Sequence, residues 1–439
     1  MRIVDRAKRY VQKLTQGLGG GAHGKAVERL VGTVICGSLA AGSCVLWWMG
    51  RALGLNDERE LKAFIQRVSR GLRKYAREIF SSVHAAHLAQ VKPLLADGRD
   101  WVVAVDVSDL AKPYARRMEY LGRVRDGSRS RKDNPVIVPG YWLHYIVAVR
   151  EDGRPLVLDA RMYSLTRPMA RSQNLETFTA VNAVRPEVPE NVFWVFDRGY
   201  DSGRFIKEFS QQQMRWIIRL NTPGRHVVLP TGRDAGHRMP VGELAAAVDC
   251  RSRAKVRRVK RGVVQVETVR YGAVTVTLPS DGRLRTLLVI QLRDDQVSDA
   301  DDVPRQGPLR NRLVYLVSEA AMSRDDQERM VNRALRRWGV EEHIRMHKQL
   351  TGFEQLRLMK YEAIQTLVFL TALAVAFLQY EVITRPQATS RIARTVPKAP
   401  PFPWFFHYRL AEALQPTLRR LYRRLWLLRR RRCYAPGGT

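Results

Sequence analysis

The sequence of 439 residues is poor in acidic residues and in cysteine. It contains 42 Asp and Glu residues against 75 Lys and Arg, a formal net charge of +33, which disfavours an acidic binding scaffold and an ordinary small-metabolite enzyme. The four cysteines form no C-x-x-C pair, so neither a zinc ribbon nor a disulfide framework is indicated. A reducing, cytoplasmic setting is the simplest interpretation. The positive charge favours a polyanionic partner, and nucleic acid comes before an anionic membrane surface.

The sequence also lacks an early apolar region in its first 30 residues, so we expect no secretory signal. Two apolar runs remain, over 31–49 and 363–378. Glycine, serine and threonine dilute the first run, and the second has 16 residues, too short for a hydrocarbon core of about 30 Å at about 1.5 Å per residue. We interpret both as buried helices, with a membrane span as the alternative.

Changes of pattern divide the chain into five regions. Residues 1–90 are expected to be helical and to bind DNA through a basic stretch, with a solvated basic face as the alternative (Arg67, Arg70, Arg73, Lys74 and Arg77). Residues 91–220 alternate strands and helices, as in an α/β fold. Residues 221–318 approach period-two alternation and predict a β-rich insertion. Residues 319–384 return to helix after a Ser323–Asp326 capping pattern, and 385–439 form a Pro-containing linker and a basic amphipathic tail.

Two acids each end an apolar run that is typical of a buried strand. Asp106 follows the run that begins at Trp101, and Asp197 follows the run that begins at Val192. A buried carboxylate is costly unless it is paired or bound to metal. If the two strands share a sheet, a third acid from a helix, Glu341, would complete a site for Mg²⁺, which prefers carboxylate oxygens and activates water or a 3′ hydroxyl.

Each of these acids has a simpler interpretation as a strand-end cap or a salt-bridge partner. Asp109 or Asp201 could also replace its neighbour as the ligand. Asp106 and Asp197 are preferred because each directly ends its apolar run. Glu342 is disfavoured because it lies about 100° around the helix from Glu341.

Cations surround Glu341 on its own helix, which we expect to begin at about Ser323 and to run through residues 333–348. At helical spacing, Arg337, Arg345 and Lys348 share the face of Glu341. This pattern suits a phosphodiester backbone, with the acid on a metal ion and the cations on phosphates. The alternative is an ion-pair ladder on a solvated helix. Trp338 either stacks on a base or, preferably, packs in the core.

The segments DVSD (106–109), DRGY (197–200) and RRWGVEEHIRMHK (336–348) resemble motifs of the DDE transposases of bacterial insertion sequences. They match the branch with a Tyr-x2-Arg-x3-Glu-x6-Lys signature. Ala334 stands where that signature has tyrosine, which puts the positioning of the transposon end in doubt. The separation of 144 residues between Asp197 and Glu341 matches members with a β-strand insertion before the last carboxylate.

The resemblance implies an α/β fold in which an RNase H-like catalytic core carries an all-β insertion, a helical N-terminal region and a basic helical C-terminal tail. It implies Asp106, Asp197 and Glu341 as catalytic ligands of Mg²⁺, with Mn²⁺ as an alternative, and Arg198 as a DNA contact. The expected activity is cut-and-paste transposition: binding of terminal inverted repeats, cleavage, and joining of 3′ ends to target DNA. A synaptic homodimer in the bacterial cytoplasm, associated with the nucleoid and not with a membrane, is expected.

Two other functions stay open beside this one. The first is a catalytically silent DNA-binding derivative of a transposase, which the replacement at Ala334 allows. The second is a basic membrane-associated protein built around the two apolar runs.

Further basic and histidine-containing segments remain. His343 and His347 have zinc-compatible spacing but not the H-E-x-x-H pattern, so we expect a DNA contact or a surface position. In 251–261, alternating cations could line a strand face and follow a DNA backbone, with solvated edge protection as the alternative (Arg251, Arg253, Lys255 and Arg257). The basic loop 123–134 could lie across bound DNA.

The tail 385–439 contains 13 Lys and Arg residues and one acid, Glu412. Leucines at helical spacing form an apolar stripe along it (Leu414, Leu418, Leu421, Leu425 and Leu428). The sequence leaves three roles open for the tail: nonspecific DNA binding, docking on another subunit, and contact with a membrane.

Overall fold

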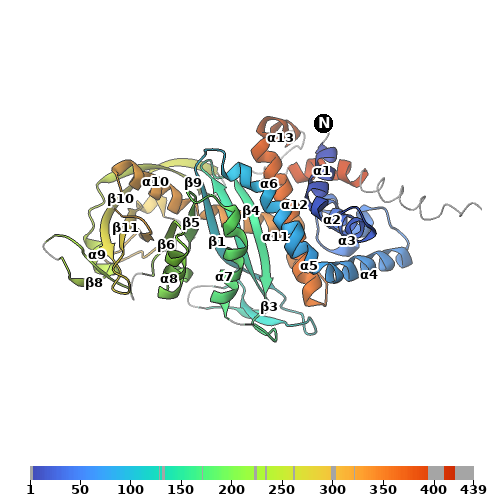
Figure 1. Ribbon diagram of the computed structural model, residues 1–439, viewed down its shortest axis with the longest axis horizontal. Coiled ribbons are helices and arrows are strands. Elements are labelled where there is room, and N and C mark those ends of the chain that lie inside the picture. Colours follow the sequence, from blue (N-terminus) through green and yellow to red (C-terminus); the bar gives the residue numbers. More distant parts are fainter. Residues whose placement is uncertain are drawn as a thin grey trace, which may run out of the picture.

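The computed structural model describes residues 3–127, 129–130, 134–170, 172–221, 225–232, 235–260, 263–297, 303–320, 322–393 and 410–420. Helices α1 to α5 gather at one end of the molecule, and the strands of one large sheet run from the middle to the other end (Figure 1). The tail leucines beyond residue 420 and residues 131–133 of the basic loop lie outside the described residues.

The N-terminal region is helical, as its periodicity predicted. Its α-helices are α1 (Ile3–Thr15), α2 (Ala22–Ala41), α3 (Leu46–Ala52), α4 (Glu58–Lys74), α5 (Ala76–Glu78) and α6 (His84–Leu95). Most of the apolar run 31–49 is buried, although Trp48 is exposed, and the run is not a single helix. Gly42 ends α2 in the left-handed conformation, at a φ of 61°, and α3 leaves at an angle of 81°. Glycine adopts this conformation without the steric cost that a Cβ would bring.

Five strands form the central part of the sheet. They are β1 (Trp101–Ala111), β3 (Ile137–Arg150), β4 (Pro155–Tyr163), β5 (Phe193–Phe196) and β6 (Trp216–Arg219), in the order β4-β3-β1-β5-β6. Strands β3 and β4 are antiparallel to their neighbours, whereas β1, β5 and β6 are parallel. A short strand, β2 (Gly122–Arg125), pairs with the start of β3. This mixed arrangement is consistent with an RNase H-like core.

The β-rich segment continues the same sheet. It contributes β7 (His226–Val228), β8 (Arg238–Pro240), β9 (Ser252–Lys260), β10 (Val263–Thr277), β11 (Leu284–Gln291) and β12 (Arg312–Val317). Strand β12 pairs with β6 in antiparallel register, Tyr315 opposite Arg219. The expectation of an all-β insertion is wrong in one respect, because helix α9 (Val241–Ala247) lies within it and buries Val241, Leu244 and Ala245.

Helices cover both faces of the sheet. Side chains of α7 (Gln173–Val184), α8 (Gly203–Gln211) and α9 share one core with one face. Helices α1 to α4, α10 (Arg324–Leu335), α11 (Trp338–Thr351) and α12 (Tyr361–Thr384) share the other, whereas α6 adds Leu88, Val91 and Leu95 to the first. The side chain of Ser323 caps α10 by accepting a hydrogen bond from the Asp326 amide at 3.2 Å, which confirms the predicted start. A last short helix, α13 (Pro386–Ala393), follows α12.

Helix α12 contains the second apolar run. By length and composition α12 could cross a membrane, and α2 with α3 passes the same test as a bent pair. However, 94% of the most apolar window of α12 is buried inside the protein, where the helix packs against β4, α2 and α4. A core helix explains its composition.

The described part of the tail packs on its own chain. Residues 410–420 form a helix that buries Leu414 and Leu418. The guanidinium of Arg419 donates a hydrogen bond to the Ala40 carbonyl of α2 at 2.8 Å. These two leucines of the predicted stripe are therefore unavailable to a membrane or another subunit while the tail is docked.

Candidate active site

Neighbouring parallel strands bring the first two acids together. In the register of β1 with β5, Val105 lies opposite Phe196, so Asp106 and Asp197 follow at the same level. Asp197 comes directly after β5, as expected. The expected end of the first strand after Asp106 is wrong, because β1 continues to Ala111 along the longer strand β3.

The junction between α10 and α11 supplies a cation to both acids. The expected uninterrupted helix is broken there, since α10 ends at Leu335 and α11 begins at Trp338. Arg337, at this break, is only 5% exposed. Its guanidinium lies 3.3 Å from an Asp106 oxygen, 3.8 Å from an Asp197 oxygen and 2.7 Å from a Glu341 oxygen. The structure thus brings the three predicted acids around one buried guanidinium.

Arg337 consequently has a different role from the expected phosphate contact. Its positive charge is buried and is shared by three carboxylates, so it is not exposed to a DNA backbone in this conformation. Desolvation opposes its charge, but the acids outweigh desolvation and raise its pKa. Ala334, where the family signature has tyrosine, is buried in α10. Tyr315 of β12 is among the groups that act on the pKa of Arg337.

The two aspartates differ in their electrostatic surroundings. Burial raises the pKa of Asp106 to about 7, because Arg337 does not offset the combined effects of desolvation, Glu341 and Asp197. Burial also acts on Asp197, but the guanidinium groups of Arg337 and Arg219 outweigh it and lower its pKa. Asp197 is therefore held ionised, whereas Asp106 titrates near neutral pH and would gain from an additional cation.

The donor chemistry of the cluster fits a hard divalent cation. Three carboxylates are the preferred ligands of such an ion, and among the described residues Oδ1 of Asp197 accepts no hydrogen bond. Within the same part of the chain, no group of three His, Cys, Asp or Glu side chains is arranged to hold a metal ion in this conformation. The guanidinium of Arg337 lies at the point where the acids converge, and an ion there would take over its neutralising role.

A small cavity of about 100 Å³ adjoins Asp106 and Asp197. Gln173 and Asn174 of α7 and Tyr200 also line it. Its size suits waters or an ion rather than a nucleotide. Sequence reasoning missed the two amides, because α7 carries no motif and reaches the acids only through the packing of the sheet.

The alternative acids have other partners. The buried carboxylate of Asp201 pairs with Arg225, and Asp109 lies 3.7 Å from the ammonium of Lys348. Glu342 is apart from Arg337; burial raises its pKa to about 7, and its Oε1 has no hydrogen-bond partner among the described residues. None of the three replaces Asp106, Asp197 or Glu341 at the guanidinium.

The other cations expected to bind DNA differ in exposure. Arg198, beside Asp197, and Arg345, on α11, are exposed, whereas Trp338 is half-buried. Lys348 is half-buried and forms an ion pair with Glu354 at 2.8 Å. A role for Lys348 in binding phosphate would require this pair to open.

The predicted basic strand face is present on β9. Arg253, Lys255 and Arg257 are exposed and alternate with buried Ala254 and Val256. Arg251 precedes the strand and pairs with Asp249 at 2.5 Å. The face is thus available to a polyanion, and its binding of DNA stays a prediction.

His343 and His347 are neither surface residues nor DNA contacts. Both are fully buried, because the inner face of α11 packs on β3. The His347 ring bonds the Tyr145 hydroxyl and the Thr371 hydroxyl, both at 2.9 Å, and burial lowers its pKa well below the usual value. A neutral ring in a satisfied core position explains this histidine without metal.

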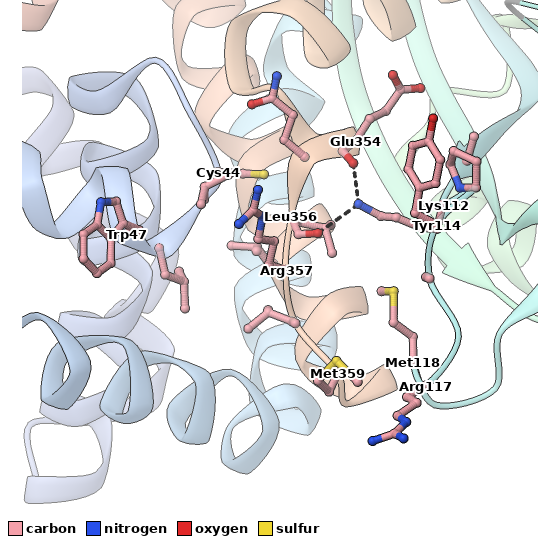
Figure 2. Close-up of a pocket in the computed structure, with 18 of the residues that line it drawn as sticks. Cys44, Trp47, Lys112, Tyr114, Arg117, Met118, Glu354, Leu356, Arg357 and Met359 are labelled. Atoms are coloured by element: carbon pink, nitrogen blue, oxygen red, sulfur yellow. Dashed lines mark hydrogen bonds between the residues drawn. The ribbon is translucent and has the colours of Figure 1, made fainter.

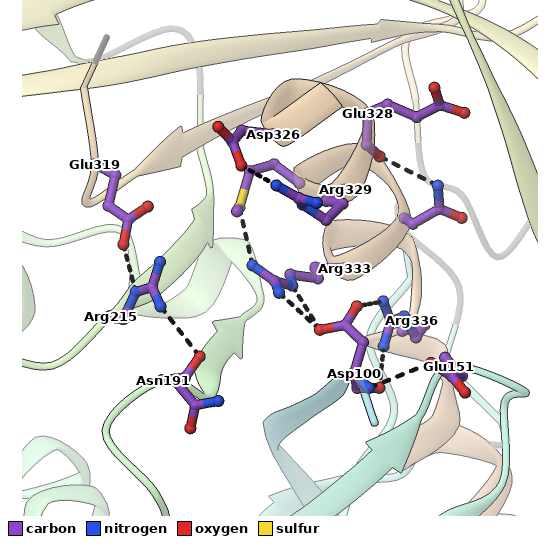
Figure 3. A network of polar contacts seen from close by, with 12 residues as sticks. Asp100, Glu151, Asn191, Arg215, Glu319, Asp326, Glu328, Arg329, Arg333 and Arg336 are labelled. Atoms are coloured by element: carbon purple, nitrogen blue, oxygen red, sulfur yellow. Dashed lines mark hydrogen bonds and ion pairs between the residues drawn. The ribbon is translucent and has the colours of Figure 1, made fainter. Parts of the chain in front are cut away.

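A polar network fixes the junction that carries Arg337. Asp100, the residue before β1, accepts hydrogen bonds from Arg333 Nη2 at 2.7 Å and from Arg336 (Figure 3). The Arg336 guanidinium also donates to the Asp100 carbonyl at 2.8 Å. Burial raises the pKa of Asp100, but the two arginines outweigh burial and hold it below 3.8. The end of α10 is thereby tied to the start of the strand that carries Asp106.

Comparisons with known proteins give one family. The model of the family described as "Transposase DDE domain" matches residues 97–377. None of the curated proteins matches the chain. Among solved structures, a cryo-EM structure of the piggyBac transposase synaptic complex with hairpin DNA is similar over 84% of this chain, with 11% identity and a TM-score of 0.36. The match spans 62% of that chain.

Proposed function

Because the chain belongs to the transposase DDE domain family, we propose that it is a divalent-cation-dependent DNA transposase of an insertion sequence. It binds the terminal inverted repeats of its element, cleaves the DNA by hydrolysis and joins the 3′ ends to target DNA. The observation that carries this proposal is the convergence of Asp106, Asp197 and Glu341 on one buried position.

The three acids would hold Mg²⁺, or Mn²⁺ in its place. The ion supplies activation of a water or a 3′ hydroxyl and stabilisation of the leaving oxygen. Asp197, whose pKa is lowered, provides a permanently charged ligand at neutral pH. Asp106, whose pKa is about 7, is fully ionised only when a cation is near or the pH is higher. Glu341 approaches from α11 and pairs with Arg337 at 2.7 Å.

Exposed cations near the acids support a phosphodiester substrate. Arg198 follows Asp197 directly, and Arg345 lies one helical turn beyond Glu341. The basic face of β9 would bind DNA farther along the sheet. Cleaving two ends of one element together requires two active sites, so we expect a homodimer on DNA. Its place would be the bacterial cytoplasm, with the nucleoid.

The test uses the full chain and linear DNA that carries the sequences flanking its reading frame. Wild type is expected to nick this DNA with Mg²⁺ or Mn²⁺ and not in EDTA. Asp197→Asn should abolish nicking, whereas Asp295→Asn, an exposed acid paired with Arg293, should leave it unchanged. Undiminished nicking by Asp197→Asn would disprove the assignment.

One observation favours a second function, a catalytically silent DNA-binding derivative. Ala334 replaces the signature tyrosine, so a contact expected to position the transposon end is missing. A footprint on the flanking repeats together with no nicking by wild type, with either metal, would identify this function.

A further inference from the structure

A large cavity lies away from the acid cluster, at the far end of β1. It measures about 1090 Å³ and is formed by α3, the loop after β1 and the segment between α11 and α12 (Figure 2). Trp47 lies on the helical side, and Lys112 and Tyr114 lie on the opposite side. Nothing in the proposed cleavage chemistry uses this cavity.

The walls of the cavity are tied together. Lys112 is buried at its edge and donates hydrogen bonds from Nζ to the carbonyls of Leu356, at 2.9 Å, and Glu354. On the other side, the Cys44 amide donates to the Thr351 carbonyl at 2.5 Å. The loop after β1, the segment that follows α11 and the start of α3 therefore hold one another in place, so the cavity does not depend on a single mobile loop.

The charge around the cavity is positive. Arg116, Arg117 and Arg357 line it and are exposed, and no ion pair joins any of them to a carboxylate within the described part of the chain. Its acid, Glu354, is already paired with Lys348 at 2.8 Å. An anionic ligand would therefore meet three cations with no carboxylate to displace.

Aromatic side chains stand open to solvent beside these cations. Tyr114 is 94% exposed and Trp48 is 54% exposed, and both line the cavity. Exposed aromatic rings next to cations form the stacking platform of proteins that bind single-stranded nucleic acid, because every unpaired base offers a face to stack on. Bases inside a duplex offer no such face.

The cavity also lies on the elements that carry the acids. Lys112 follows Asp106 by six positions along and just beyond β1, about 20 Å at about 3.3 Å per residue. On the helical side, α11 carries Glu341 and then Lys348, which pairs with Glu354 of the cavity. A DNA strand whose phosphate lies at the acids could thus reach the cavity within about six nucleotide steps of about 3.4 Å.

We propose that this cavity binds unpaired nucleotides of a DNA strand, with phosphates on Arg116, Arg117 and Arg357 and bases stacked on Trp48 and Tyr114. The inference rests on the proposed function, because it concerns DNA on which the chain acts as a transposase. It adds that part of this DNA is bound in unpaired form. Binding itself is measured without metal and without cleavage.

The test measures fluorescence anisotropy of a labelled thymidine oligonucleotide, and of the corresponding duplex, with the full chain in EDTA. Tyr114→Ala and Trp48→Ala should each weaken binding of the single strand about tenfold and binding of the duplex less than twofold. Tyr114→Phe should retain wild-type affinity, because the ring remains. Met169→Ala, an exposed apolar residue outside the cavity, is the matched control.

A separate variant tests the arginines that line the cavity. Arg117→Gln should weaken binding of the single strand and reduce the dependence of affinity on salt, whereas Arg310→Gln, an exposed arginine paired with Asp294, should do so less. Unchanged affinity in both aromatic variants, or an equal loss for duplex and single strand, would overturn the inference.

Failure of the inference can be told apart from failure of the proposed function. If Asp197→Asn abolishes nicking but the aromatic variants bind single strands normally, the transposase assignment stands and the cavity has another occupant. If wild type does not nick but the aromatic variants lose single-strand binding selectively, the cavity is a nucleotide site on a chain without the proposed activity.

Discussion

Arg337 gives the sharpest prediction, because one side chain lies within 4 Å of all three acids of the cluster. At an effective dielectric constant of about 20, its contacts at 2.7, 3.3 and 3.8 Å correspond to attractions of about 6, 5 and 4 kcal/mol. Desolvation of the guanidinium and repulsion among the acids cancel most of this gain. Removing one partner of a buried ion pair costs about 3–5 kcal/mol. The acid side chains are 21–36% exposed, so we expect about 3 kcal/mol, the lower end of that range, for Arg337→Met.

The measurement is urea unfolding followed by circular dichroism, in EDTA at pH 8, where Asp106 is ionised. In the proposed function, Mg²⁺ or Mn²⁺ should restore more stability to Arg337→Met than it adds to wild type, because the acids have lost their own cation. Arg345→Met is the control, since Arg345 is exposed and also lies four residues from Glu341. Wild-type stability of Arg337→Met in EDTA would refute the role of Arg337 as counterion. If the cation raised the stability of wild type and of Arg337→Met by the same amount, competition between Arg337 and the cation for the acids would be refuted.

Three further predictions concern the supporting structure. His347→Ala should lower the free energy of unfolding by about 3 kcal/mol. Zinc should shift the melting temperatures of wild type and His347→Ala equally, and a larger zinc-induced rise in wild type would contradict the core role. Asp100→Asn should cost about 1–3 kcal/mol at pH 7. Because folding lowers the pKa of Asp100 from 3.8, the difference in stability between wild type and Asp100→Asn is present above pH 3.8. It shrinks as the pH falls through the folded pKa. A difference that stays constant during acid titration would contradict the ion pairs. Leu414→Asp should destabilise the chain by about 3 kcal/mol, whereas the exposed Glu412→Gln should change stability by less than about 0.5 kcal/mol; equal effects would contradict docking of the tail.

The strands and the acids were predictable because their signals are local. A short apolar run followed by an acid indicates a buried strand and the residue at which that strand ends. This pattern placed Asp197 correctly, directly after β5. The same logic ended the first strand too early, since the length of β1 is set by pairing with β3 up to Gly140, opposite Ala111. Strand length thus depended on a partner that the local pattern does not contain.

The position of Arg337 was not predictable from helical spacing alone. Spacing placed it beside Glu341, which is correct, but gave no reason for the break at the end of α10. That break is held by Asp100, which is distant in sequence and bonds Arg333 and Arg336. His343 and His347 were misassigned for a related reason, because packing on β3 decides which face of α11 is buried.

The long separation between Asp197 and Glu341 is bridged by sheet pairing rather than by a free linker. After β6 the chain leaves for the outer strands, and β12 returns it to the edge of β6, where the Leu220 amide bonds the Val314 carbonyl at 2.9 Å. Helix α10 then starts from this fixed place and leads to Arg337. Strands added beyond β12 extend the sheet outward without moving that return point. The 144 residues between the two acids are therefore compatible with a rigid, shared site.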